Sequence, residues 1–267
     1  MRPMRPLQDW QVGPLIGVFT DIDDTLTTEG AITPDALQAL GQLQAAGLKV
    51  VAITGRPVGW SEPFARQWPV DAIVAENGAV ALLRYDSAEG LRKLYQDPAD
   101  VRAERFERMQ AVLERIEREV PGARRAQDSA GRETDIAIDH SEFTTLAPQA
   151  IDAVVALMQA SGLRATVSSI HINGWIGHHD KLAGARWIVQ QLWGRALDAE
   201  RAQWVYVGDS TNDQIMFEHI EHSVGVANVR RFAAQLQHPP RYITKGERGA
   251  GFAELARHVL QATTARR

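Results

Sequence analysis

The sequence predicts an α/β protein whose core is a doubly wound parallel sheet. Two observations predict this fold class. Short apolar runs alternate with amphipathic helical segments, and several of the runs end in polar residues. Alternating strands and helices favour right-handed crossovers, because a helix that follows a twisted strand packs back onto the sheet with that hand.

Five short apolar runs are predicted to be core strands, because parallel strands buried on both faces are apolar along their length. A helix is expected over 33–46, since Thr33 suits the N-cap and Leu37, Leu40 and Leu43 recur at helical spacing. The predicted strands are residues 15–20, 48–53, 70–75, 204–207 and 224–227.

A second set of elements, α+β in type and called the cap here, is expected over 83–176, between the segments 1–82 and 177–267. Its longest helix is expected over 101–120, where one face is apolar and the other carries opposite charges four positions apart. We expect the cap helices to cover one face of an antiparallel sheet. The remaining cap elements are a strand at 134–140, a helix at 148–160 and one or two strands within 164–172.

The other face of the cap sheet is expected to be polar and to cover the functional site. Alternate residues of a strand share a face. The isoleucines predicted to contact the cap helices are Ile136, Ile138, Ile170 and Ile172. The open face would then carry Asp135, Ala137, Asp139, Ser169, His171 and Asn173. For His171, an ordinary partly buried histidine is an equally good interpretation.

Composition excludes several classes of protein. The 267-residue chain has a net charge of −4, so no basic excess indicates a nucleic-acid partner. Without cysteine, the chain has no disulfide, thiolate zinc site or cysteine nucleophile. The sequence shows neither a signal-peptide pattern nor an apolar run of roughly 18 residues, the length of a membrane span. We therefore expect a cytoplasmic protein without a membrane partner; its oligomeric state is not predicted.

The strongest functional signal is VFTDIDDTLT, residues 18–27, in which an apolar strand leads directly into Asp21, Asp23 and Asp24. Carboxylates crowded at a strand end repel one another unless a cation or a substrate group offsets their charge. Oxygen ligands suit hard cations such as Mg2+, and an aspartate beside a metal can attack phosphorus. The alternative is a solvated acidic turn, or a helix N-cap formed by Asp24 or Thr25.

Two further polar segments follow predicted strands, one at Thr54 and one at Asp209. Ligands of doubly wound sheets bind at the carboxyl ends of the strands, so we expect both residues to lie near Asp21. Asp213 is four positions after Asp209 across a strand-to-helix turn, and both carboxylates can face one ion. Capping of the next helix is the alternative for this segment, by Ser210, Thr211 or Asn212.

Lys181 is expected near the start of a helix over 180–192. A lysine is unfavourable there, because the helix dipole favours anions at the N-terminus. The position is explained if Lys181 faces the carboxylates and an anionic substrate. A solvated surface lysine is the simpler interpretation of Lys181 taken alone.

Together these segments resemble the four motifs of the haloacid dehalogenase superfamily of phosphohydrolases. DIDDT at 21–25 is similar to the first motif, ITGR at 53–56 to the second, Lys181 to the third and GDSTND at 208–213 to the fourth. ENGA at 76–79 and ERGAGFAEL at 247–255 are similar to segments of the Cof-like, large-cap subgroup (subclass IIB), which includes sugar-phosphate phosphatases and phosphomannomutases. The resemblance implies a Rossmann-like core with an inserted α+β cap domain, residues 83–176, that selects the substrate.

The resemblance also implies roles for residues of this chain. Asp21 would be the nucleophile, and Asp23 would protonate the leaving group and then deprotonate water. Thr54 and Lys181 would hold phosphate oxygens. Mg2+ would be bound by Asp21, the Asp23 carbonyl and Asp209, with Asp213 in support. Substrate contacts are expected from Gly55, Arg56, Ser169, His171, Asn173 and Asn212.

The sequence thus predicts a Mg2+-dependent phosphatase of a small phosphorylated metabolite, with a sugar phosphate as the favoured substrate. A phosphomutase with the same nucleophile and a non-catalytic protein that binds a phosphorylated metabolite are the alternatives. Unrecognisable phosphomannomutase cap motifs disfavour the first, and the presence of all the motif carboxylates disfavours the second. Binding of a second anion and a surface loop are both open for Arg124, Arg125 and Arg132.

Overall fold

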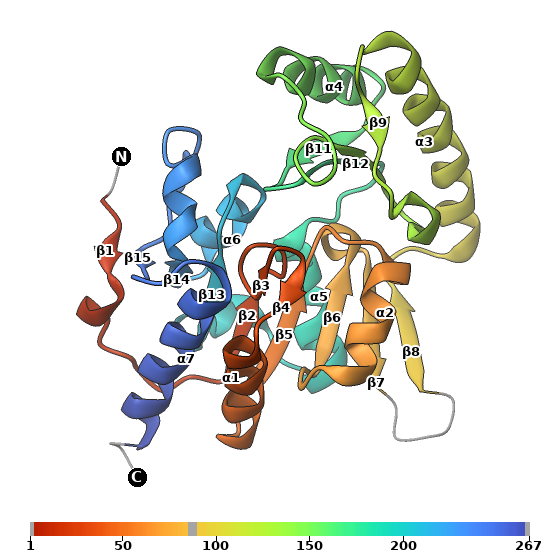
Figure 1. Cartoon of the computed structure of the whole chain (residues 1–267). Helices are drawn as coiled ribbons and strands as arrows, with labels where there is room; N and C mark the ends of the chain where they lie inside the picture. Colours follow the sequence, from red (N-terminus) through yellow and green to blue (C-terminus); the bar gives the residue numbers. More distant parts are fainter. Residues whose placement is uncertain (1–2, 85–89, 265–267) are drawn as a thin grey trace.

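The computed structural model describes residues 3–84 and 90–264, and its core is a nine-stranded sheet (Figure 1). In sheet order the strands are β1 (Arg5–Pro6), β15 (Tyr242–Ile243), β14 (His222–Gly225), β13 (Trp204–Gly208), β2 (Gly17–Thr20), β5 (Lys49–Ile53), β6 (Ala72–Ala75), β7 (Val80–Arg84) and β8 (Leu91–Tyr95). Strands from β1 across to β6 pair in parallel, and β7 and β8 continue in antiparallel pairs. The predicted α/β core is confirmed, with an antiparallel edge that was not predicted.

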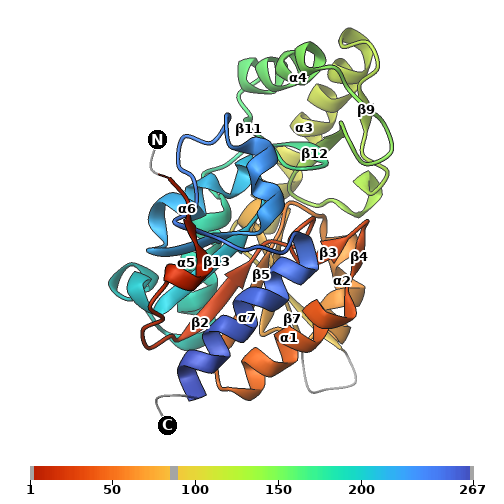
Figure 2. The same cartoon turned by 60° about the vertical axis from the view of Figure 1, so that its left-hand side comes forward.

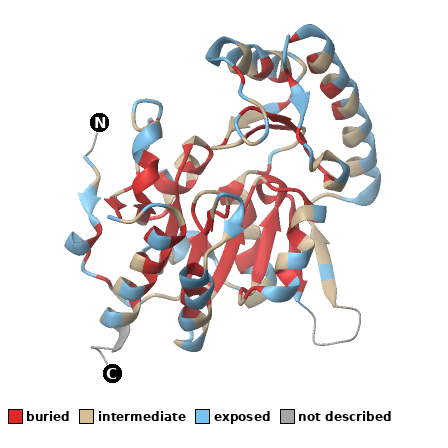
Figure 3. Ribbon diagram, in the orientation of Figure 1, coloured by how far each residue is buried: buried red, intermediate tan, exposed pale blue. Residues whose placement is uncertain are grey.

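Helices cover both faces of this sheet, which is why its central strands are buried (Figure 3). On one face lie α1 (Pro34–Ala45), α2 (Val58–Gln67) and α7 (Arg248–Thr264). Of these, α1 and α7 run side by side (Figure 2). On the other face lie α5 (Lys181–Trp193) and the short α6 (Gln214–His219). A small hairpin of β3 (Thr27–Thr28) and β4 (Ala31–Ile32) follows the first acidic segment.

Two sequence predictions about the core, those for Leu37 and for the strand at 224–227, need correction. Leu37 is 37% exposed, and the stripe of α1 that packs on the sheet is Ala36, Ala39, Leu40 and Leu43. Leu37 is turned about 100° around the helix from Ala36, away from the sheet. Thr33 occupies the N-cap position, but its side chain makes no capping hydrogen bond. The last predicted strand is displaced, because Ala227 already belongs to a 3₁₀ turn after β14.

The cap contains a four-stranded antiparallel sheet in the order β11 (Arg164–Val167), β12 (His171–Trp175), β10 (Ile136–Asp139) and β9 (Arg124–Arg125). Helices α3 (Ala99–Glu119) and α4 (Pro148–Ala160) pack on one face of it. Their apolar residues form one cluster with Ile136, Ile138 and Ile172. Figure 1 shows the cap as a separate layer above the core.

The prediction for Ile170 is wrong. Ile170 precedes β12 and lines pockets beside Asp23 instead of contacting the cap helices. The strand alternation begins only at His171, and a turn in which Ser168 Oγ accepts hydrogen bonds from the backbone of Ile170 and His171 comes before it. Counting alternate residues back through such a turn assigns the wrong face.

The sequence places the start of the cap at residue 83, whereas β8 extends the core sheet to Tyr95. We propose that the cap begins after Tyr95 and ends near Trp175, with core segments on either side. Within the described residues, no helix combines the length and the apolar character needed to cross a membrane.

Candidate active site

Three neighbouring strands of the core end at the same polar rim. Strand β2 leads to Asp21, β5 to Thr54 and β13 to Asp209, and β2 lies between the other two. All three side chains are buried. The Thr54 hydroxyl accepts a hydrogen bond from the backbone N–H of Arg56 at 3.0 Å, which turns the chain back over the rim. Residues from distant parts of the sequence therefore meet at the carboxyl ends of the strands.

Lys181 lies at the centre of the acidic cluster. Its Nζ is 2.6 Å from Asp21 Oδ1 and 2.6 Å from Asp213 Oδ1. These carboxylates raise the pKa of Lys181, although burial alone would lower it. At 2% exposure Lys181 is not a solvated surface residue. The two carboxylates offset its unfavourable place in the first turn of α5, where Asp180 caps the helix by accepting from the Ala183 N–H.

Asp213 organises the turn that follows β13. Its Oδ2 accepts hydrogen bonds from the backbone N–H groups of Asp209 and Ser210, at 2.8 and 3.0 Å. Its Oδ1 accepts from Lys181 and from the Tyr206 hydroxyl. Ser210 and Asp213 also form a capping box. The interpretation of this segment as a helix cap is therefore correct, and Asp213 belongs to the acidic cluster as well. Protein donors thus occupy both oxygens of Asp213.

The cluster carries more negative charge than Lys181 balances. Carboxylate oxygens of Asp21, Asp209 and Asp213 lie within 4.8 Å of one another. Burial, opposed by Lys181 and reinforced by neighbouring carboxylates, raises the pKa of Asp21 to about 8. Burial and the same neighbours raise the pKa of Asp209 well above its usual value. A cluster of this kind is stabilised by bound positive charge.

Asp209 has a carboxylate oxygen that is available as a ligand for a cation. Its Oδ2 accepts from Asn228 at 3.0 Å, whereas its Oδ1 is buried and meets no hydrogen-bond donor within the described part of the chain. An orphaned carboxylate oxygen beside Asp21 is suited to a hard divalent cation, which takes oxygen ligands. The residues present therefore fit Mg2+.

Asp23 turns toward Arg56 of the second motif. Arg56 Nε is 3.0 Å from both carboxylate oxygens of Asp23, while Nη2 is 2.6 Å from Glu142 and Nη1 is 3.2 Å from Asp128 in the cap. These carboxylates raise the pKa of Arg56 against the effect of burial. Arg56, which the sequence places among the substrate contacts, thus joins Asp23 to the cap.

A small enclosed cavity lies between the rim and the cap. Its volume of about 10 Å³ is close to the space that one water molecule requires. The Ser169 hydroxyl is buried there without a hydrogen-bond partner in residues 3–84 and 90–264. The lining includes Asp21, Asp23 and all six residues expected to contact substrate: Gly55, Arg56, Ser169, His171, Asn173 and Asn212.

His171 and Asn173, on the open face of the cap sheet, also hold the cap against the core. His171 Nε2 lies 2.9 Å from Glu142 Oε2, and Asn173 Nδ2 donates to the Gly55 carbonyl at 3.2 Å. Burial raises the pKa of Glu142, but hydrogen bonds from His171 and Arg56 outweigh this effect and hold it at about 2. The open face of the cap is therefore a docking surface as well as a lining of the cavity.

The cap arginines divide into buried and exposed residues. Arg132 is buried, ion-paired to Asp135 at 2.8 Å, and its Nη1 donates to the Gly55 carbonyl. Arg125 forms an ion pair with Glu117 on the outer surface of the cap. The interpretation of Arg132 as part of a surface loop is therefore wrong, because its charge serves the contact between cap and core.

Comparisons with known proteins show what this chain is similar to in sequence and fold. Residues 18–104 match the family described as haloacid dehalogenase-like hydrolase. The predicted resemblance to this superfamily is confirmed. A comparison with curated proteins finds no match.

Solved structures share the fold over nearly the whole chain. A putative HAD/COF-like hydrolase from Plasmodium vivax has 18% sequence identity and a TM-score of 0.67, covering 94% of this chain and 97% of that one. The sucrose-phosphatase from Synechocystis, solved with sucrose and phosphate, has 18% identity and a TM-score of 0.65, covering 92% and 98%. A Thermoplasma acidophilum protein has 16% identity and a TM-score of 0.69, covering 93% and 99%. Identities this low establish the haloacid dehalogenase-like fold alone.

The ENGA segment, residues 76–79, connects the cap to the rim. Glu76 is fully buried and accepts hydrogen bonds from the backbone N–H groups of Val58 in the core and of Glu133 and Thr134 in the cap. Gly78 has φ +111° and faces the Asp180 carbonyl so closely that a Cβ would overlap it. The segment therefore sets the position of the cap and of the helix start that carries Lys181.

Asn228 belongs to the site but was missed by the sequence analysis. Its Nδ2 donates to Asp209 and to the Asp24 carbonyl, and its Oδ1 accepts from the Arg248 N–H. Arg248 Nε in turn lies 2.9 Å from Asp24 Oδ1, so Asp24 pairs away from the cluster. The only sequence signal for Asn228 is its place just after β14, at the same edge of the sheet as Asp209.

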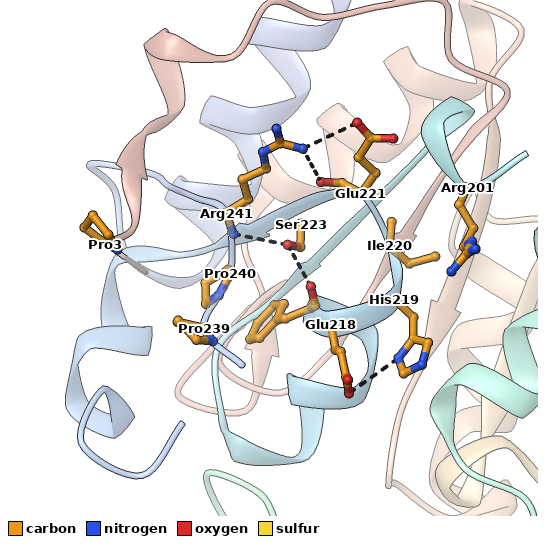
Figure 4. A pocket seen from close by; sticks show the side chains of 11 residues that line it. Pro3, Arg201, Glu218, His219, Ile220, Glu221, Ser223, Pro239, Pro240 and Arg241 are labelled. Atoms are coloured by element: carbon orange, nitrogen blue, oxygen red, sulfur yellow. Dashed lines mark hydrogen bonds and ion pairs between the residues drawn. The ribbon is translucent and has the colours of Figure 1, made fainter. Parts of the chain in front are cut away.

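Another pocket, of about 400 Å³, has no place in this chemistry (Figure 4). Glu221 and Arg241, on its wall, directly precede β14 and β15, so the pocket lies at the amino ends of the strands. The two side chains pair with each other at 3.5 Å. Ligands of doubly wound sheets bind at the opposite, carboxyl ends.

Proposed function

We propose that this protein is a Mg2+-dependent phosphatase that acts on a small phosphorylated metabolite, with sugar phosphates as the favoured substrates. The observation that carries the proposal is the excess of buried carboxylates around Lys181, with one Asp209 oxygen left without a donor. Such a cluster is costly to bury unless cationic and phosphoryl groups complete it. The similarity to a sucrose-phosphatase supports a sugar leaving group.

In the proposed reaction, Asp21 attacks phosphorus in line with the leaving oxygen. The new bond joins an Asp21 oxygen to phosphorus, and the bond from phosphorus to the sugar oxygen breaks. Asp23 gives its proton to that sugar oxygen, and then takes one from the water that hydrolyses the aspartyl phosphate. Lys181 and Thr54 hold phosphate oxygens, and Asp213 holds Lys181 in place.

Mg2+ would be held by Asp21, the Asp23 backbone carbonyl and Asp209. When bound, it neutralises charge on the equatorial phosphate oxygens, the main requirement of phosphoryl transfer. Asp213 supports this site indirectly, because protein donors fill its two oxygens.

The test is a panel of phosphorylated metabolites with Mg2+ and detection of free phosphate. We expect release of phosphate that a chelator abolishes and that Asp21→Asn reduces at least about a thousandfold, a loss of about 4 kcal/mol of transition-state stabilisation. Asp198→Asn, an exposed aspartate at the surface, serves as the control. Appreciable phosphate release by Asp21→Asn would overturn the proposal, and so would a panel in which the unaltered protein releases phosphate from none of the esters. An isomerised phosphosugar as the product would indicate a mutase.

A further inference from the structure

A larger pocket opens directly beside the enclosed cavity. Its volume of about 590 Å³ lies within the roughly 300–1,000 Å³ typical of small-molecule sites. Asp23, Arg56 and Ile170 line both spaces. Because the proposed acid Asp23 faces both, a group that leaves phosphorus on the side of Asp23 passes into this pocket. The enclosed cavity, with room for about one water, does not hold such a group.

Phe143 is one of the residues that line this pocket. It is 61% exposed, whereas the other large apolar side chains of the described residues, Leu37 excepted, are at least partly buried. The loop that carries Phe143 is held by Asp139, whose buried carboxylate accepts hydrogen bonds from the backbone N–H groups of Ser141, Glu142 and Phe143. An aromatic ring kept in the open by a fixed loop is preorganised to stack on the apolar face of another ring.

The charges on the wall are predominantly negative. Four carboxyl groups and two guanidinium groups line the pocket, and each guanidinium already has a carboxylate partner. Glu142 is ionised at neutral pH, because contacts with His171 and Arg56 outweigh burial and hold its pKa at about 2. Glu29, in the hairpin between β3 and β4, is exposed and also lines the pocket. A second phosphate or a carboxylate on the ligand would meet repulsion here, whereas hydroxyl groups would find acceptors.

We propose that Phe143 and Glu29 decide which leaving groups this pocket accepts, because Phe143 favours a ring over an acyclic alcohol and the acidic lining disfavours a second phosphate or a carboxylate. Phe143 contacts one face of the ring, and the acidic wall accepts hydrogen bonds from its hydroxyl groups. The inference rests on the proposed phosphatase function and deepens it, because it makes Phe143 and Glu29 the residues that set specificity.

The first experiment measures kcat/KM with Mg2+ for the best hexose monophosphate of the panel and for glycerol phosphate, which has no ring. Phe143→Ala is expected to lower the ratio of the two values at least about fivefold, and Phe143→Trp to preserve it. Leu37→Ala, which removes an exposed apolar side chain on α1, is the matched control and keeps the ratio of the original protein. An unchanged ratio in Phe143→Ala would overturn the inference while the phosphatase function stands.

The second experiment tests the charge of the wall with a hexose bisphosphate. The unaltered protein is expected to prefer the monophosphate at least about tenfold, and Glu29→Lys to reduce that preference at least about threefold. Glu104→Lys, the same reversal on the exposed face of α3, is the control and leaves the preference unchanged. A preference of the unaltered protein for bisphosphates or for nucleoside monophosphates would overturn the inference. Absence of phosphate release from every ester would instead overturn the proposed function itself.

Discussion

The core rim and the contact between cap and core are both buried groups of charged side chains, but their carboxylates are satisfied differently. At the contact, Glu142 and Asp135 each lie within ion-pair distance of a guanidinium. At the rim, Asp209 has only the amide of Asn228 as a donor, and one of its oxygens has none within the described chain. Against the effect of burial, contacts with His171 and Arg56 lower the pKa of Glu142. Burial raises the pKa of Asp135 to about 7 despite Arg132, and it raises the pKa of Asp209 well above its usual value.

The difference separates a docking surface from a reaction site. Charges that satisfy one another hold two domains together and require nothing further. A carboxylate that the protein itself leaves incomplete indicates a place for a group that is not part of the chain. Burial alone does not distinguish the two, since Asp135 and Asp209 are both fully buried.

The largest expected effect comes from removing Lys181, the cation that contacts both Asp21 and Asp213. Lys181→Met should destabilise the protein by about 3–5 kcal/mol and stop phosphate release, because Asp21 and Asp213 lose their shared partner. Arg186→Met on the same helix removes an exposed ion pair and should cost at most about 1 kcal/mol. Urea unfolding of both variants gives the two losses of unfolding free energy. Equal losses would contradict the distinction between the buried rim and an exposed ion pair.

His179, in the link between the last cap strand and α5, should contribute to the loss of stability in mild acid. Burial lowers the pKa of His179 to about 4, below its usual 6.5. As the pH falls from about 6.5 toward 4, His179 is protonated in the unfolded chain but stays neutral in the folded protein. The free energy of unfolding therefore decreases by at most about 3 kcal/mol.

The comparison of His179→Gln with His178→Gln, an exposed neighbour, isolates this effect. Urea unfolding at pH 7 and pH 4.5 should show a smaller acid-induced loss in His179→Gln than in the unaltered protein, and the full loss in His178→Gln. The same loss in all three proteins would show that the acid sensitivity arises elsewhere.

Mg2+ should stabilise the folded protein by binding the Asp209 oxygen that has no hydrogen-bond donor in the described residues. At a Mg2+ concentration of 100 times Kd, mass action adds about 2.7 kcal/mol to the free energy of unfolding. Asp209→Asn should lose most of that gain, whereas Asp198→Asn, an exposed aspartate, should keep it. Thermal unfolding with and without Mg2+ measures the gain, and an undiminished gain in Asp209→Asn would mean that the ion binds elsewhere.

The smallest effect is expected at the contact. His171→Ala removes one of the two partners of Glu142, the other being Arg56, and should cost about 1–3 kcal/mol in kcat/KM. Because His171 acts there through docking of the cap, the loss should be similar for a hexose phosphate and for glycerol phosphate, unlike the loss in Phe143→Ala. A loss confined to the hexose phosphate would make His171 a direct sugar contact and blur the distinction between the two groups.

The sequence by itself determined the main core residues of the site and that most of them lie at strand ends. Each apolar strand runs into its polar residue within a few positions, so Asp21, Thr54 and Asp209 were placed at strand ends by local pattern, and the parallel topology brings such ends together. The misplaced charge of Lys181 and the alternation of Ile136 and Ile138 are likewise properties of neighbouring residues.

Only the tertiary structure decided how the charges pair. Arg56 meets Glu142 across 86 positions, and Asn228 meets Asp209 across the gap between two strand ends. Such partners depend on sheet order and on how the cap docks, neither of which leaves a periodic signal in the sequence. For the same reason the buried role of Arg132 is visible only in the folded protein, because it follows from a contact between domains. The exposure of Phe143 likewise depends on the loop that Asp139 holds.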